Sequence, residues 1–185
     1  MKLSNFVRVK QPYIIFLRGI NVGGKATVKM DLLKALLAKT GFGEVKTYIN
    51  SGNISLLTEM GKERVEKIFI EILKSHFGVT ADLMIKTRKE LQEIISKIPF
   101  NELTECDNAK RVVVMLSEMA DQERLRGLKE DRSIVENFYP AGDVIYIYYK
   151  NGIGRSKFTI NLIERKLKVL ATARNWNTML KMRDA

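Results

Sequence analysis

Two glycine-rich, basic segments of the chain contain the residue types that bind anions. The first, residues 18–25, reads RGINVGGK, and the second, residues 151–157, reads NGIGRSK. Glycines allow successive backbone N–H groups to turn toward a ligand, and the flanking Arg and Lys side chains add positive charge. The first segment is not a Walker A loop, because Ala26 stands where that motif has Ser or Thr. Both segments predict an anion site, and the alternative is a glycine-rich connection without a ligand.

The second segment precedes a predicted helix. We expect Ser156 to cap this helix, which would run to Lys166. Arg155 and Lys157 bracket the serine, so an anion there would meet the positive end of the helix dipole and two cationic side chains. The alternative is an ordinary capped turn.

A third polar segment, residues 172–178 (TARNWNT), contains the only tryptophan of the chain. Beside Arg174 and Asn175, the ring of Trp176 is able to stack on a ligand. A single Trp on a helix belongs more often to the core, and the asparagines also serve as caps.

Catalytic groups of the familiar kinds are scarce. His76 is the only histidine and Cys106 the only cysteine, and neither has an evident partner for a triad, a metal cluster or a disulfide. Acidic residues fall mainly on predicted helix faces as solvated charge. We therefore expect no metal and no cofactor, and the sequence assigns no catalytic residue.

Hydrophobic periodicity predicts the elements that position these segments. In the first half they are a strand at 13–17, a helix that includes 32–37, strands at 45–49 and 54–57, a helix that includes 65–73, and a strand at 82–87. This order, βαββαβ, is that of the ferredoxin-like motif.

The second half repeats the order. After a helix at 88–98 and a polar joint at 101–110, we expect a strand at 111–116, a helix at 121–130, strands at 133–138 and 144–149, a helix at 156–166, a strand at 168–171 and a last helix capped by Thr172. The predicted fold is α+β, with two tandem ferredoxin-like (βαββαβ) subdomains plus a C-terminal helix. We place them at 1–87 and 111–185, joined by a helix and connecting segment at 88–110 in one compact unit.

Tyr146 and Tyr148 lie on one face of a predicted strand. RNA-recognition domains stack bases on aromatic residues of such a sheet, but their RNP1 pattern is absent here. Packing of the sheet is the favoured interpretation of these tyrosines.

Positive charge gathers at the two ends of the chain. The formal net charge is +11, and residues 1–29 carry six Lys or Arg and no acid, whereas residues 150–185 carry nine against two acids. If the fold brings the two ends together, they form one basic face suited to a polyanion. A basic protein without such a partner is the alternative. No apolar run is long enough for a membrane helix and no signal peptide is evident, so we expect a cytoplasmic protein without a membrane partner.

Five stretches also carry a resemblance to a known family. They are LRGINVGG (17–24), YINSGN (48–53), YPAGDVIY (139–146), GRSKFT (154–159) and TARNWNT (172–178). In this order they resemble the bacterial domain-of-unknown-function family 1697 (DUF1697). The resemblance implies a tandem ferredoxin-like arrangement and assigns no activity and no catalytic residues.

The polar residues of these stretches are the candidate ligand-binding residues, since core packing alone does not demand Arg, Asn and Ser there. We expect them to form one shared cleft: Arg18, Asn21, Gly23, Gly24, Lys25, Asn50, Ser51, Asn53, Arg155, Ser156, Lys157, Arg174, Asn175 and Trp176. The favoured function is binding of nucleic acid, a nucleotide or another phosphorylated small molecule. An enzyme acting on a small anionic substrate and a protein-interaction module are the alternatives, and the oligomeric state is not predicted.

Overall fold

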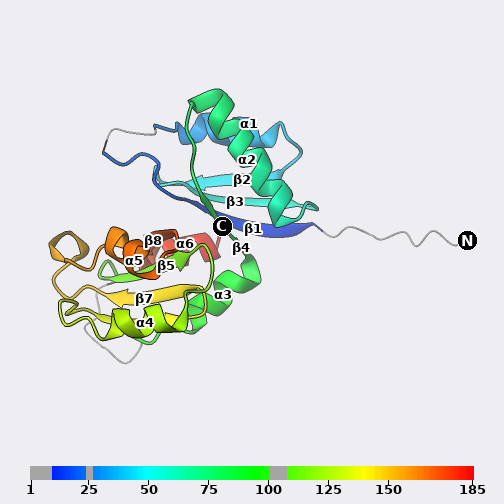
Figure 1. The fold of residues 1–185 in the computed structure, drawn as a ribbon. Helices are drawn as coiled ribbons and strands as arrows, with labels where there is room; N and C mark the ends of the chain where they lie inside the picture. Colours follow the sequence, from blue (N-terminus) through cyan, green and yellow to red (C-terminus); the bar gives the residue numbers. More distant parts are fainter. Residues whose placement is uncertain (1–9, 24–26, 101–107) are drawn as a thin grey trace, which may run out of the picture. The chain divides into compact units, whose positions relative to one another are not determined.

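The computed structural model describes residues 10–23, 27–100 and 108–185. It divides into two compact units, residues 1–88 and 89–185. Each unit contains one four-stranded antiparallel sheet (Figure 1). The predicted mixture of helices and strands is confirmed, and the described residues form six α-helices.

The first unit has the element order βαββαβ. Its elements are β1 (Gln11–Leu17), α1 (Met30–Ala38), β2 (Gly43–Tyr48), β3 (Asn53–Thr58), α2 (Lys62–Phe77) and β4 (Leu83–Thr87). The strands lie in the order β2-β3-β1-β4, so β1 is hydrogen-bonded to β3 on one side and to β4 on the other.

Alternation along β1 explains how the helices attach to this sheet. Successive side chains of a strand point to opposite faces, so Ile15 and Leu17 share one face. Both are buried in a cluster with Leu33 and Leu37 of α1 and Phe69 of α2. Both helices therefore pack on the same face of the first sheet.

The second unit repeats this order after α3 (Arg88–Ser96), which begins at the boundary. Its further elements are β5 (Arg111–Leu116), α4 (Gln122–Lys129), β6 (Asn137–Ala141), β7 (Val144–Tyr148), the 3₁₀ turn η1 (Ile153–Arg155), α5 (Ile160–Leu167), β8 (Ala171–Asn175) and α6 (Trp176–Arg183). The strand order is β6-β7-β5-β8, with β5 in the central position. Buried residues of α4 and α5 join Val114 and Ile147 in its core.

The helix predicted to start at Ser156 begins later, so that prediction is wrong. Thr159 is the N-cap of α5, and its side-chain oxygen accepts a hydrogen bond from the N–H of Leu162 at 3.2 Å. Ser156 cannot do this because its hydroxyl is engaged with Glu136 and with the N–H of Phe158.

The end of the chain also differs from the prediction. Thr172 does not cap a helix but lies within β8, paired with Met115 of β5. The cap of α6 is Asn175, whose side chain accepts from the N–H of Thr178 at 2.9 Å. Lys168, predicted to start the strand, instead ends α5 in the left-handed conformation.

The strand predicted at 133–138 is displaced to β6. The side chain of Asp131 accepts from both the N–H and the hydroxyl of Ser133 and forms an ion pair with Lys166 of α5 at 2.6 Å. These contacts fold residues 131–133 into a turn, and the ladder of the sheet starts only at Asn137.

In the described part of the chain, no helix combines the length and the apolar character needed to cross a bilayer.

Gly52, in the turn between β2 and β3, lies where a side chain has no room. Its φ is +76°, and a Cβ atom would lie 2.7 Å from Cβ of Leu17 and 2.8 Å from Cδ1 of Ile20. We expect Gly52→Ala to lower the free energy of unfolding by about 2 kcal/mol or more, from backbone strain and overpacking together.

Gly78 provides the matched control for this substitution. It also has positive φ, at +64°, but no atom lies within 4 Å of the position that a Cβ atom would take there. Gly78→Ala should therefore show only the backbone cost, about 1 kcal/mol. Urea denaturation of the two variants measures the difference in their free energies of unfolding. Equal decreases would show that the close approach of Leu17 and Ile20 to Gly52 does not contribute to the cost of the substitution.

Candidate functional site

The first glycine-rich segment is fixed to the sheet on both sides. The N–H of Leu17 donates to the carbonyl of Gly52 at 2.8 Å, and the N–H of Arg18 donates to the carbonyl of Asp82 at 2.9 Å. The Arg18 guanidinium also forms an ion pair with the carboxylate of Asp82 at 3.2 Å. Its charge is thus partly balanced by a neighbour. Gly24 and Lys25 lie outside the described residues.

Asn21 holds the segment in place. Its side-chain amide donates to the carbonyls of Val28 at 3.0 Å and Asn50 at 2.6 Å, and its side-chain oxygen accepts from the N–H of Val28 at 2.8 Å. The residue has φ of +55°, a conformation that Asn tolerates better than most residues. Asn21 therefore connects the loop after β1 to Val28, at the end of that loop, and to the turn between β2 and β3. Gly23, two residues further along, is exposed.

The turn between β2 and β3 is also stabilised from within. The Asn53 side chain is fully buried and donates to the carbonyl of Tyr48 at 2.9 Å and to the hydroxyl of Ser51 at 3.1 Å. Asn21 and Asn50 contribute to the lining of a cavity of about 910 Å³ at the start of α1. In this turn, polar residue types have structural roles as well as any binding role.

Of the candidates at the end of the chain, Arg174 and Trp176 are buried and Asn175 is exposed. Arg174 is 7% exposed and donates to the hydroxyl of Thr172 at 2.9 Å and to the carbonyl of Ala173 at 2.8 Å. Burial disfavours its charged form and lowers the pKa of the guanidinium to about 10. Asn175 is the cap of α6, and Trp176 is 6% exposed.

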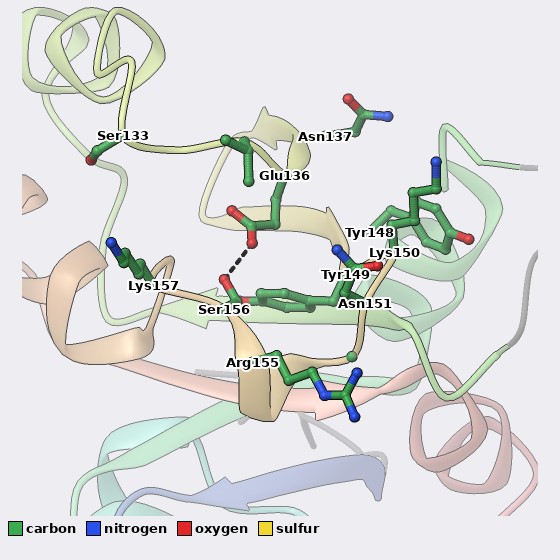
Figure 2. A pocket seen from close by; sticks show the side chains of 12 residues that line it. Ser133, Glu136, Asn137, Tyr148, Tyr149, Lys150, Asn151, Arg155, Ser156 and Lys157 are labelled. Atoms are coloured by element: carbon green, nitrogen blue, oxygen red, sulfur yellow. Dashed lines mark hydrogen bonds between the residues drawn. The ribbon is translucent and has the colours of Figure 1, made fainter.

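The second glycine-rich segment forms one wall of a cavity of about 520 Å³ in the second unit (Figure 2). The other wall is the segment that enters β6. The lining residues are Ser133, Val135, Glu136, Asn137, Tyr148, Tyr149, Lys150, Asn151, Gly152, Arg155, Ser156 and Lys157. The two walls meet because Asn137 and Tyr148 are partners in the β6–β7 ladder.

A hydrogen bond joins the two walls. The hydroxyl of Ser156 donates to Oε1 of Glu136 at 2.5 Å and accepts from the N–H of Phe158 at 2.8 Å. Figure 2 shows the two side chains pointing toward one another across the cavity. The N–H of Phe158 therefore orients the hydroxyl of Ser156, and this hydroxyl orients the carboxylate of Glu136.

Tyr149 holds the residues that follow the second glycine-rich segment. Its hydroxyl is buried and donates to the carbonyl of Phe158 at 2.8 Å. Burial raises the pKa of this phenol, and the negative charge of Glu136 raises it further. The ring of Phe158 packs against that of Phe138, with 4.9 Å between the centroids.

Three cationic side chains line the cavity: Lys150, Arg155 and Lys157. All three residues are exposed, and in the described part of the chain none of them forms an ion pair. In Figure 2, Lys157 and Lys150 lie on opposite sides of the Glu136–Ser156 pair, and Arg155 extends on a third side. With the one carboxylate, the lining carries a formal charge of +2.

The structure thus brings three of the predicted residues, Arg155, Ser156 and Lys157, to one cavity. Asn21 and Asn50 meet in the first unit through a hydrogen bond. A single cleft containing both groups stays a prediction, since the groups belong to different units.

Sequence reasoning missed Glu136 and Lys150. Glu136 fell inside a predicted strand, and Lys150 immediately precedes the second segment. The signal that could have indicated Lys150 was the excess of basic residues from position 150 onward. In the residues that the structure describes, no three His, Cys, Asp or Glu side chains are grouped so as to hold a metal ion.

The hydrogen bonds of Asn21 lead to a stability prediction. Asn21→Ala removes three bonds and leaves the N–H of Val28 without its partner, so we expect the free energy of unfolding to fall by about 1–3 kcal/mol. Asn50→Ala is the matched control, because Asn50 contributes only its backbone carbonyl to this contact. Urea denaturation should show a much smaller loss for Asn50→Ala, and similar losses would contradict the assigned role of Asn21.

Comparisons with known proteins place the chain in a family. No curated protein matches it. The structure of the conserved bacterial protein SP0830 from Streptococcus pneumoniae is similar, with a TM-score of 0.74 and 20% sequence identity over 95% of this chain and 98% of that one. At this identity the likeness shows the fold alone. A family model described as a protein of unknown function matches residues 11–146, and the chain therefore belongs to that family, DUF1697.

Proposed function

We propose that the protein binds a small phosphorylated ligand, such as a nucleotide or sugar phosphate, in the cavity of the second unit. The observation that carries the proposal is the placement of Lys150, Arg155 and Lys157 around one cavity without ion-pair partners in the described part of the chain. Cations that are not neutralised by neighbours are available to a ligand.

The residue types suit a phosphate. The planar guanidinium of Arg155 is able to bond two phosphate oxygens at once, and the two lysines add mobile point charges. Gly152, with φ of +83°, allows the turn that leads into this loop, and Gly154 places no side chain directly before Arg155. A volume of about 520 Å³ lies within the range of about 300–1,000 Å³ that is usual for pockets that hold small ligands.

A small ligand is favoured over a nucleic acid. Tyr146, one of the two tyrosines in position to stack on bases, is 1% exposed and donates its hydroxyl to the carbonyl of Ile94 in α3 at 2.7 Å. Burial raises the pKa of this phenol to about 12. The second, Tyr148, packs against Phe100 with 6.0 Å between the ring centroids. These contacts support sheet packing as the role of the two tyrosines.

We also propose that each unit is a ferredoxin-like fold. The support is the element order βαββαβ in both units together with the matching strand orders β2-β3-β1-β4 and β6-β7-β5-β8. In this arrangement the ligand cavity lies beside the edge hairpin of the second sheet.

The test is calorimetric titration with inorganic phosphate and with AMP at low salt. We expect the double variant Arg155→Ala/Lys157→Ala to bind at least about 10-fold more weakly, because each charge-assisted contact contributes roughly 1.5–3 kcal/mol. The matched control is Arg132→Ala/Lys129→Ala, which removes the same charges from exposed residues outside the cavity.

Two results would contradict this function. One is unchanged binding by the cavity variant, and the other is equal weakening by the control, which would indicate a general charge effect. The salt dependence separates the ligand classes, because nucleic acid loses affinity steeply as counterions compete for many phosphates. A steep salt dependence with single-stranded RNA, without binding of AMP, would replace the small-ligand proposal.

A further inference from the structure

The cavity proposed to bind an anion also contains a carboxylate, that of Glu136. A carboxylate repels a phosphate, so its presence needs an explanation in terms of the ligand. Among the described residues, Glu136 has one hydrogen bond, which its Oε1 accepts from Ser156. The second oxygen, Oε2, accepts no hydrogen bond from any described residue.

A chain of two hydrogen bonds fixes the orientation of the Glu136 carboxylate. The N–H of Phe158 holds the hydroxyl of Ser156, and that hydroxyl holds Oε1. Tyr149 does not donate to the carboxylate, because its hydroxyl is bonded to the carbonyl of Phe158. The Glu136 carboxylate is therefore already oriented before a ligand binds, and its Oε2 is able to accept a hydrogen bond from a ligand.

We propose that Glu136 selects phosphate esters that carry a free hydroxyl group, which donates to its second carboxylate oxygen while the phosphate meets Arg155, Lys157 and Lys150. This inference rests on the proposed function and names the ligand class. Sugar phosphates, glycerol phosphate and the ribose of a nucleotide share this chemistry.

The charge of the lining favours a hydroxyl over an ammonium group as the donor. Three cations and one carboxylate surround the cavity, so an ammonium group would meet a net positive field. A neutral hydroxyl avoids that repulsion and still forms a hydrogen bond to a charged acceptor, which is stronger than a bond between neutral groups.

The experiment compares ligands that differ only in hydroxyl groups. Glycerol 3-phosphate is paired with propyl phosphate, and AMP with 2′,3′-dideoxy-AMP, using calorimetry on the full chain. A hydrogen bond to a charged group corresponds to roughly 10-fold or more in affinity. We expect this preference for the hydroxylated member in at least one pair, and equal affinities in both pairs would overturn the inference.

Two variants distinguish the effect of the negative charge of Glu136 from the effect of its orientation. Glu136→Gln should reduce the preference toward equality and at the same time strengthen binding of inorganic phosphate about 3-fold or more, because a repelling charge is removed. Ser156→Ala keeps the charge but releases the carboxylate, so it should reduce the preference without that gain. Glu118→Gln, an exposed acid outside the cavity, is the control and should change neither quantity.

The possible failures are distinguishable. If all the phosphate compounds bind through Arg155 and Lys157 but Glu136→Gln leaves the preference intact, the selection by Glu136 is wrong and the proposed function stands. If the wild-type protein binds none of them, both are wrong. Tighter binding of phosphoethanolamine than of glycerol 3-phosphate would overturn the assignment of a hydroxyl donor.

Discussion

Each unit depends on a central strand whose backbone is hydrogen-bonded on both edges. β1 pairs with β3 and β4, and β5 pairs with β7 and β8. The pairing continues past the ends of the strands, where the N–H of Arg18 donates to Asp82 and the N–H of Tyr149 donates to Lys110 at 2.9 Å. The glycine-rich segments therefore begin next to hydrogen-bonded backbone, the first after β1 and the second after β7, which pairs with β5.

The polar candidate residues that the structure describes include two groups with different roles. Asn21, Asn53 and Asn175 use their side chains to satisfy backbone groups of turns and of a helix end. Arg155 and Lys157 are exposed and make no ion pair in the described part of the chain. A buried backbone group without a partner is costly, so loops that pass close to a core need side chains of the first group. Of these two groups, the second carries positive charges that no carboxylate neutralises in the described part of the chain, and these charges are available to a ligand.

Periodicity predicted most elements, because the cores follow the alternation of strands and the 3.6-residue repeat of helices. The two errors at helix starts come from contacts with residues distant in the sequence. Ser156 was a suitable cap by type, but its partner Glu136 lies 20 positions away, and no local pattern indicates that contact. Thr172 was also a suitable cap, but pairing with β5 extends the strand to Asn175. The basic part of the site was visible in the sequence, whereas its carboxylate was not.

The register of the β6–β7 hairpin places that carboxylate. Ala141 pairs with Val144 across the two-residue turn at Gly142, which has φ of +63°, and Asn137 pairs with Tyr148 at the other end. Glu136 directly precedes this last pair and Tyr149 directly follows it, so the end of the ladder brings both residues to the cavity. Because a slip of one residue turns every side chain to the other face, a tight turn at the far end of the hairpin controls which side chain reaches Ser156. The geometry of the cavity is thus determined as much by this turn as by the residues that line it.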